Sequence, residues 1–258
     1  MPSKTDFNVS PYYDDFSEDK KFHRVMYRPA FAVQARELTT QQTILQNQIE
    51  KLGDSMYKHG SMVIPGETTY DLNHFSIKLT SFTGTLANFT DTVITGGTSG
   101  VTATVKSVAA TDGTDPDTLF VKYSNSGTDN VSASFTDGET ITSSASTGET
   151  AVVSSSHTGC AAFIDAGTYY INGFFVEVDS QSLILDKYTN TPDYRVGLTV
   201  TENFITSTDD TTLLDNATGS SNANATGAHR FKITLTLAKL SLTSTADASF
   251  IETFRLKS

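Results

Sequence analysis

The stretch LTTQQTILQNQIEKLGDSMYKHG, residues 38–60, decides how this chain is organised. It contains no proline and, before Tyr57, no aromatic residue, whereas Gln, Glu, Leu and Ile are abundant. These residues favour a helix, while the sequence that follows is rich in Thr, Ser, Gly and Asn, which favour strands and turns. The sequence therefore predicts a mainly β protein with one long α-helix near its N-terminus.

Both ends of this helix carry capping signals. Thr39 is followed three residues later by Gln42, which is the spacing of a capping box. Gly60 follows a Lys-His pair, as expected for a left-handed glycine cap with cations near the negative end of the helix dipole. We expect the helix to span about residues 40–59, within a segment 39–60 that serves oligomerisation.

Apolar residues recur along this helix at heptad spacing, which predicts the seam of a short coiled coil. The helix can pack on identical copies of itself, or it can lie on the chain's own β-domain, because fewer than three heptads form a short run. Gln42 favours self-association, since a polar residue at a seam position can fix the register. The predicted oligomerisation residues are Leu38, Gln42, Leu45, Ile49, Leu52 and Met56.

The segment 1–38 has the features of an extended arm. Pro11 and Pro29 interrupt it, and its aromatic side chains are too irregularly spaced for a helix and too numerous for a solvated tail. We therefore expect the arm to dock, either on its own domain or on a neighbouring protein. The predicted docking residues are Phe7, Tyr12, Tyr13, Phe16, Phe22 and Tyr27.

The β-rich remainder is predicted to hold one domain inserted into another. Between residues 82 and 157 short β-runs alternate with Gly-containing turns and a Ser-rich stretch, and this composition differs from that on either side. We expect 82–157 to form a small β-module in a loop of a parent antiparallel β-domain made of residues 61–81 and 158–258. Surface hairpins tolerate such insertions because their two ends lie close together.

The parent domain carries clear local signals. Asn172-Gly173 between two apolar runs predicts a type I′ hairpin. Residues 194–201 and 231–240 alternate as strands, and residues 213–227 between them form a loop rich in turn formers. Loops of that length inside a compact domain are usually functional or interfacial.

Charge and composition exclude several functional classes. The 258 residues have a net charge of −11, and residues 1–60 hold eight Lys or Arg and eight Asp or Glu, so the acidity lies in the β-rich remainder. Because phosphate binding requires clustered Lys and Arg, we expect no nucleic-acid partner. No apolar run approaches the roughly 18 residues of a membrane span, and the polar, acidic N-terminus does not resemble a signal peptide. We therefore expect synthesis in a cytoplasm and no membrane insertion.

Sequence patterns that would indicate catalysis or metal binding do not occur. The single cysteine, Cys160, can form no intrachain disulfide, and its apolar neighbours indicate a buried small side chain. The glycine-rich stretch 96–100 lacks the Lys of a phosphate-binding loop. We expect no catalytic residue, no cofactor and no metal, because the histidines are scattered without a ligand motif; they are His23, His59, His74, His157 and His229.

Six blocks of the sequence outside the insert stand together: NVSPYYDDF (8–16), RVMYRPAFAVQARELTTQQTILQNQIEKLGDSMYKHGSMVIPG (24–66), GTYYINGFFVEV (167–178), LDKY (185–188), YRVGLTVTE (194–202) and DDTTLLDNATGSSNANATGAHRFKITLTL (209–237). In this order they resemble a family of virion structural proteins from tailed bacteriophages, a family described mainly as a domain of unknown function. Two modules of the insert, ITGGTSGVTATV (94–105) and DPDTLFVKYSNSG (115–127), are similar to parts of structural proteins from large phages of aquatic bacteria, including cyanobacteria.

The resemblance implies a structural component of a phage tail, baseplate or tail fibre that is located in the virion and has other tail or baseplate proteins as partners. It also implies a homotrimer, like other fibre and wedge proteins, and it brings no catalytic residues. The heptad pattern is compatible with a trimer but does not select it, because Leu at one seam position and Ile at the other lean toward two strands.

Two other functions compete with a purely structural one. A tail-associated hydrolase would need paired acids in a cleft, and the sequence gives no sign of them. A receptor- or carbohydrate-binding tail protein would use the insert, and sugar sites usually need exposed aromatic side chains. The insert offers five aromatic residues, most of them at strand positions that predict burial: Phe82, Phe89, Phe120, Tyr123 and Phe135.

Overall fold

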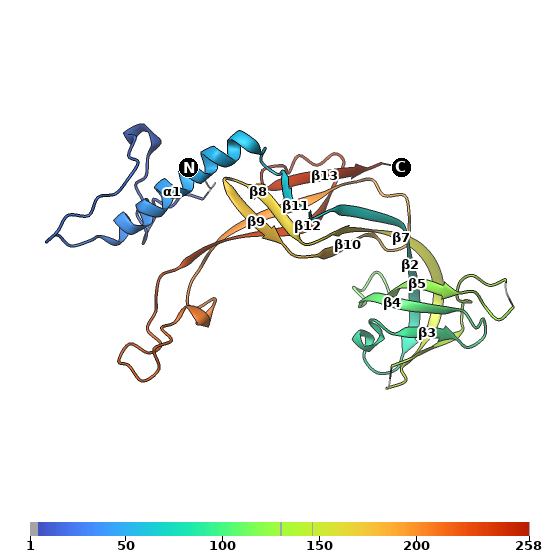
Figure 1. The fold of residues 1–258 in the computed structure, drawn as a ribbon. Helices are drawn as coiled ribbons and strands as arrows, with labels where there is room; N and C mark the ends of the chain where they lie inside the picture. Colours follow the sequence, from blue (N-terminus) through green and yellow to red (C-terminus); the bar gives the residue numbers. More distant parts are fainter. Residues whose placement is uncertain (1–4, 130, 146, 258) are drawn as a thin grey trace.

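The computed structural model describes residues 5–129, 131–145 and 147–257, and it is mainly β with one long helix near the N-terminus, as the sequence predicts (Figure 1). The helix α1 (Ala35–Met56) lies beside the extended arm at one end of the molecule. Throughout the described ranges the strands pair antiparallel. No helix in these ranges is long and apolar enough to cross a membrane.

The helix α1 begins earlier than its capping signals predict. The backbone N–H of Gln34 donates to Glu37 Oε2 at 2.9 Å, so the capping contact precedes the predicted one. Thr39 lies inside the helix, where its hydroxyl donates to the Ala35 carbonyl oxygen at 3.2 Å. The predicted cap at Thr39 is wrong because a Gln and a Glu form the contact, in place of the Ser, Thr, Asp or Asn usually found at the cap position.

The helix also ends earlier than predicted. Its last turn closes with the Tyr57 N–H on the Gly53 carbonyl oxygen at 2.7 Å, and Tyr57 is already extended. Gly60 is left-handed, with φ +84°, but it donates its N–H to the Tyr170 carbonyl oxygen at 2.8 Å in the turn that leads to the first strand. The predicted glycine cap is therefore wrong, and Gly60 instead shapes the passage from helix to sheet.

Two three-stranded sheets build most of the parent domain, in the orders β1-β8-β9 and β12-β11-β13. The β8–β9 hairpin turns at Asn172 and Gly173, with φ +47° and +84°, so the predicted type I′ hairpin is confirmed. The two predicted strands at 194–201 and 231–240 are also confirmed, within β11 and β12. The bounds are β1 (Met62–Ile64), β8 (Gly167–Ile171), β9 (Phe174–Val178), β11 (Tyr194–Ile205), β12 (Arg230–Ser241) and β13 (Phe250–Leu256).

The third sheet closes on itself as a barrel. Its pairings run from β2 through β5, β4, β3, β6 and β7 back to β2, and β10 extends the other end of β7. Closure leaves these six strands no free edge within the barrel, which protects them from pairing with other chains. The bounds are β2 (Thr68–Phe82), β3 (Val93–Gly96), β4 (Thr102–Ala109), β5 (Thr118–Asn125), β6 (Thr140–Ser143), β7 (Thr150–Ile164) and β10 (Gln181–Asp186).

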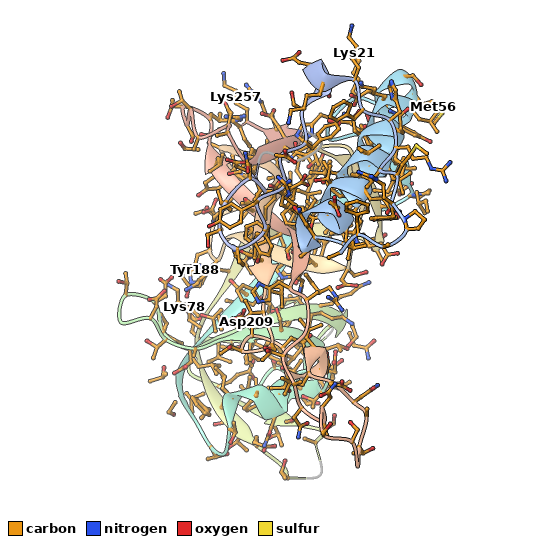
Figure 2. The ribbon with its side chains drawn as sticks, turned by 90° about the vertical axis from the view of Figure 1, so that its left-hand side faces the viewer. Lys21, Met56, Lys78, Tyr188, Asp209 and Lys257 are labelled. Atoms are coloured by element: carbon orange, nitrogen blue, oxygen red, sulfur yellow. The ribbon has the colours of Figure 1, made fainter. Side chains whose placement is uncertain are left out.

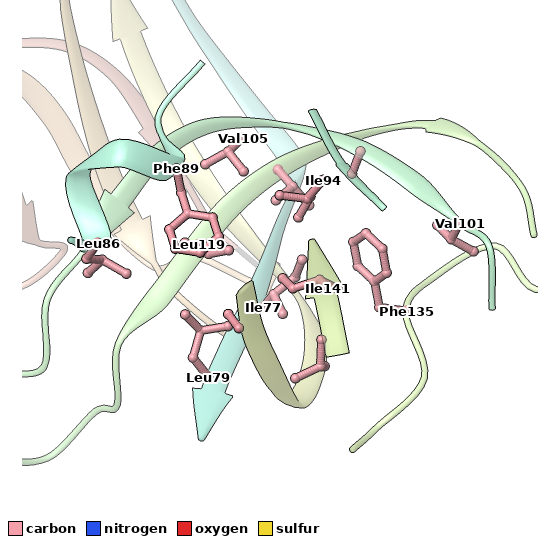
Figure 3. Packing of buried hydrophobic residues seen from close by; sticks show 14 residues of the cluster. Ile77, Leu79, Leu86, Phe89, Ile94, Val101, Val105, Leu119, Phe135 and Ile141 are labelled. Atoms are coloured by element: carbon pink, nitrogen blue, oxygen red, sulfur yellow. The ribbon is translucent and has the colours of Figure 1, made fainter. Parts of the chain in front are cut away.

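The barrel and the parent domain have separate hydrophobic cores. Figure 3 shows the barrel core, in which Phe89 and Leu119 pack with Ile77 and Leu79 from β2. This core therefore begins before residue 82, where we expected the module to start. The parent core includes Cys160, which is fully buried, as its apolar neighbours predict. The strand β7 contributes residues to both cores, and β2 pairs with it, through several bulges, from the parent end at Thr68 to the barrel end at Phe82.

The segment that follows β10 fastens the barrel to the parent domain. Lys78 Nζ lies 3.8 Å from the centre of the Tyr188 ring, and Figure 2 shows these two residues side by side at the junction. The Tyr188 hydroxyl is 2.9 Å from Thr118 Oγ1, and Lys187 Nζ is 2.9 Å from an Asp115 carboxylate oxygen. These contacts join β2, β5 and the loop before β5 to one short segment, Lys187–Tyr188, which we name the strap.

Replacing the barrel by a short Gly-Ser turn between His74 and Gly159, which are paired on β2 and β7, should leave the parent domain folded and its oligomeric state unchanged. Closing such a loop costs no more than about 1 kcal/mol relative to an ordinary loop. Circular dichroism melting and light scattering check this prediction. An insoluble product would show that the barrel strands complete the parent core.

Candidate assembly surface

One face of α1 is bound to the β8–β9 hairpin. A Cβ added at Gly53 would lie 2.4 Å from Tyr170 Cε2, so the glycine allows the Tyr170 ring to pack against the helix backbone. The Tyr170 hydroxyl is 2.9 Å from the Glu50 carbonyl oxygen and 2.8 Å from Asp54 Oδ1, both of them acceptors. Burial raises the pKa of Tyr170 far above its ordinary value, so the hydroxyl keeps the proton that these contacts need.

A second face of α1 is bound to the first part of the arm. Asp14 is 2% exposed, and its carboxylate accepts hydrogen bonds from Thr40 Oγ1 at 2.8 Å and from Thr43 Oγ1 at 2.5 Å. Further along the helix, Asn47 Nδ2 donates to Glu18 Oε1 at 2.7 Å, and this bond is the main reason why the pKa of Glu18 is lowered. The arm thus runs along its own helix.

Two of the six predicted docking rings pack on the parent sheet. Phe7 makes edge contacts with Phe204 and Phe231, at centroid distances of 5.8 and 5.0 Å. Tyr12 lies 4.9 Å from the Phe204 ring, and its hydroxyl is 2.7 Å from His229 Nδ1. This part of the arm docks on its own domain.

The other four predicted docking residues are placed differently. Phe16 is half-buried, whereas Tyr13, Phe22 and Tyr27 are exposed. The Tyr27 hydroxyl still reaches the helix and donates to Gln41 Oε1 at 2.6 Å. The arm therefore has a docked first part and a second part that presents aromatic rings to solvent.

We name residues 20–33, the second part of the arm, the arm tip. Phe22, Met26 and Phe31 in this segment are 65%, 80% and 61% exposed. It holds four Lys or Arg and no Asp or Glu, which sets it apart from the acidic remainder of the protein. Figure 2 shows Lys21 pointing away from the body of the molecule. The arm tip is thus both apolar and cationic.

The remaining face of α1 carries the predicted seam, and this face is exposed. At 3.6 residues per turn, the seam residues occupy a single sector between the two bound faces. The five apolar members are 45% to 61% exposed. Single exposed apolar side chains are common, but a row of five is a patch of the kind that marks an interaction surface. We name this set the helix stripe: Leu38, Gln42, Leu45, Ile49, Leu52 and Met56.

A groove of about 900 Å³ opens beside the N-terminal half of the helix stripe. Phe7, Phe204 and Phe231, the aromatic cluster of arm and sheet, line it on one side, and α1 lines it on the other. Leu38 and Gln42 belong both to the groove and to the helix stripe, so the two surfaces are continuous.

The described residues contain no group of three or more His, Cys, Asp or Glu side chains placed to hold a metal ion. His74 stacks on Phe120 at a centroid distance of 5.3 Å, and burial lowers its pKa. His157 lies 5.2 Å from the Tyr188 ring. His229 lines the groove, where its ring contacts the Tyr12 hydroxyl. These histidines therefore have separate packing environments.

The aromatic residues of the barrel do not form an exposed platform. Phe89, Phe120 and Phe135 are at most 3% exposed, and Phe82 and Tyr123 are partly buried against the barrel core. A sugar ring would need one of these faces to be open to solvent.

One property of the glycine-rich stretch 96–100 is not predicted from the sequence. It wraps around the carboxylate of Glu139, which is 4% exposed and accepts hydrogen bonds from the N–H groups of Thr98 and Ser99, both at 3.0 Å. A Cβ at Gly96 would lie 2.6 Å from Glu139 Oε2, so glycine is needed for this approach. The stretch holds a carboxylate of its own chain, and no local sequence signal marks a partner 40 residues away.

Comparisons with known proteins place the C-terminal half of the chain in a described family. Residues 128–257 match a family whose description is "Domain of unknown function (DUF4815)". The matched region begins in the second half of the barrel and continues through β13. No curated protein and no solved structure matches the chain.

Proposed function

The chain belongs to the DUF4815 family, a domain of unknown function, and from this premise we propose that it is a structural subunit of a phage tail or baseplate. In this proposal the protein self-associates through the helix stripe as a homotrimer, and its arm anchors it to neighbouring tail proteins. It is a component of the virion that is made in the host cytoplasm.

The observation that best supports this proposal is an exposed helix stripe on a helix whose other two faces are already bound. A single chain leaves this apolar surface in water, and its burial is worth roughly 25 cal/mol per Å². Identical copies can bury it without disturbing the protomer, because Asp14 and Tyr170 already hold the helix in place. The blocks that resemble phage virion proteins, 8–16 and 24–66, include this helix and most of the arm.

The trimer rests on the resemblance to fibre and wedge proteins. The helix stripe by itself is compatible with two or three strands, since Leu38, Leu45 and Leu52 alternate with Gln42, Ile49 and Met56 in the seam. Subunit number is therefore the first quantity to measure.

Light scattering on the purified chain at micromolar concentration tests the self-association. We expect the mass of three chains. The mass of two would retain self-assembly and reject the trimer, and a folded monomer would reject the assembly role of the helix stripe. A reconstruction of an intact particle tests the location, since a chain absent from the tail and baseplate would contradict the proposal.

A further inference from the structure

The two flanks of the helix stripe differ, although they lie at the same level of α1. On one flank, a small pocket lies between Gln41 and Leu45 of the helix and four residues of the arm tip, which are His23, Arg24, Val25 and Tyr27. On the other flank, Leu38 and Gln42 border the groove. Because successive helical residues are about 100° apart, Gln41 and Gln42 lie on opposite sides of the line through Leu38 and Leu45. The arm tip and the groove therefore flank the same half of the seam.

This asymmetry distinguishes parallel from antiparallel helices. In a parallel bundle, unlike flanks of neighbouring helices meet at the same height, whereas in an antiparallel pair like flanks meet. Like flanks would bring two arm tips together, each with four basic side chains and no acidic one. Unlike flanks bring an arm tip, with its exposed apolar side chains, to the aromatic groove.

Charge counts against the pairing of like flanks. Lys21, Arg24 and Arg28 of the arm tip have no ion pair within the described part of the chain. The exposed carboxylate of Asp209 lies outside the groove lining; hydrogen bonds from Thr206 account for most of its lowered pKa, and the charge of the groove residue His229 lowers it further. Its neighbour Asp210 is also exposed. The groove lining itself contains Arg230 and no acidic residue, so the apolar side chains of the arm tip, more than its charges, suit the groove.

We infer that the arm tip of one protomer occupies the groove of the next protomer in a parallel assembly. Phe22, Met26 and Phe31 of the second copy then pack on the aromatic cluster of the groove. This inference rests on the self-association proposed above. In this arrangement every interface joins two different surfaces, the arm tip of one protomer and the groove of the next. The ring closes when each arm tip occupies a neighbouring groove.

Disulfide trapping tests this arrangement in the full chain. The native Cys160 is buried, so introduced surface cysteines carry the reaction. Met26 is exposed on the arm tip, and Ala228 is an exposed residue of the groove lining. We expect the double variant Met26→Cys, Ala228→Cys to form, on mild oxidation, a ladder of linked chains that ends at the subunit number found by light scattering. A reducing agent should remove the ladder.

Two controls define the result. The double variant Met26→Cys, Lys106→Cys replaces the groove cysteine by one at an exposed barrel position and should give no ladder. The single variant Met26→Cys should stay unlinked. Pairs linked through Met26→Cys alone would show that arm tips meet each other, and linkage within one chain would show that a groove takes its own arm tip; either result overturns the inference.

The same experiment separates this inference from the proposed function. If the chain is monomeric before oxidation, both the proposed self-association and the seating of the arm tip are rejected. An oligomer that forms no ladder with the Met26→Cys, Ala228→Cys pair leaves self-association intact and overturns only the seating of the arm tip.

Discussion

Replacing Leu45 by Asp is expected to convert the oligomer into folded monomers. Leu45 is 57% exposed in the single chain, so the new carboxylate meets water there and the protomer keeps its fold. In the assembly the same carboxylate would be buried in an apolar seam, which costs several kcal/mol. A cost of about 3 kcal/mol weakens association roughly a hundredfold for each subunit joined. Size-exclusion chromatography with light scattering over a concentration series measures this change.

Val131→Asp is the matched control for this prediction. Val131 is 83% exposed on the barrel, so the substitution exchanges one exposed aliphatic side chain for the same carboxylate away from the helix stripe. We expect it to keep the wild-type mass and thermal midpoint. A Leu45→Asp chain that also kept the wild-type mass would show that the helix stripe is not the interface. Loss of its helical circular dichroism signal would show that Leu45 supports the protomer itself.

Glu139→Gln is expected to destabilise the barrel. The Glu139 carboxylate accepts N–H bonds from Thr98 and Ser99 at 3.0 Å and from Thr136 at 2.6 Å, so both of its oxygens face donors. The amide of Gln would turn an NH₂ group toward at least one of these donors. Replacing charge-assisted bonds by an unsatisfied buried donor costs about 2 to 4 kcal/mol. In a domain of the size of the barrel, this loss of stability lowers the midpoint of thermal unfolding by roughly 10 to 20 °C.

The pH dependence gives this prediction a second readout. Burial alone would raise the pKa of Glu139, but the N–H bonds outweigh it and the pKa is lowered. A carboxyl group with a lowered pKa stabilises the fold above its ordinary pKa, and this stability is lost as the pH falls through the lowered value. The difference between wild type and Glu139→Gln should therefore shrink in acid. Asp137→Asn, an exposed carboxylate in the same turn, is the control and should have little effect at any pH.

The helix stripe and the hairpin at Asn172-Gly173 could be predicted because a few neighbouring residues specify each of them. Heptad spacing marks one face of a helix, and the Asn-Gly pair supplies two residues that accept positive φ. The errors at the ends of α1 also have a local cause. Gln34 forms a cap that rules based on Ser, Thr, Asp and Asn overlook, and Gly60 has the expected conformation but serves the next turn.

The barrel and the groove could not be predicted, because they depend on contacts between distant residues. The barrel closes where β6 pairs with β7, and nothing in either short strand specifies that partner. The groove combines Phe7, Leu38 and Phe231 from three separate segments. Composition marks the module only from residue 82, because Ile77 lies on a strand that continues the parent pattern into the barrel core.

The continuity of β2 and β7 has a mechanical consequence. Two paired strands, and not a single linking chain, carry the barrel, because β2 and β7 stay hydrogen-bonded to each other from the parent domain into the barrel and β10 pairs with the parent end of β7. The Lys187–Tyr188 strap resists bending at the junction. A displacement of the barrel is therefore passed through paired strands to the parent domain that holds the helix.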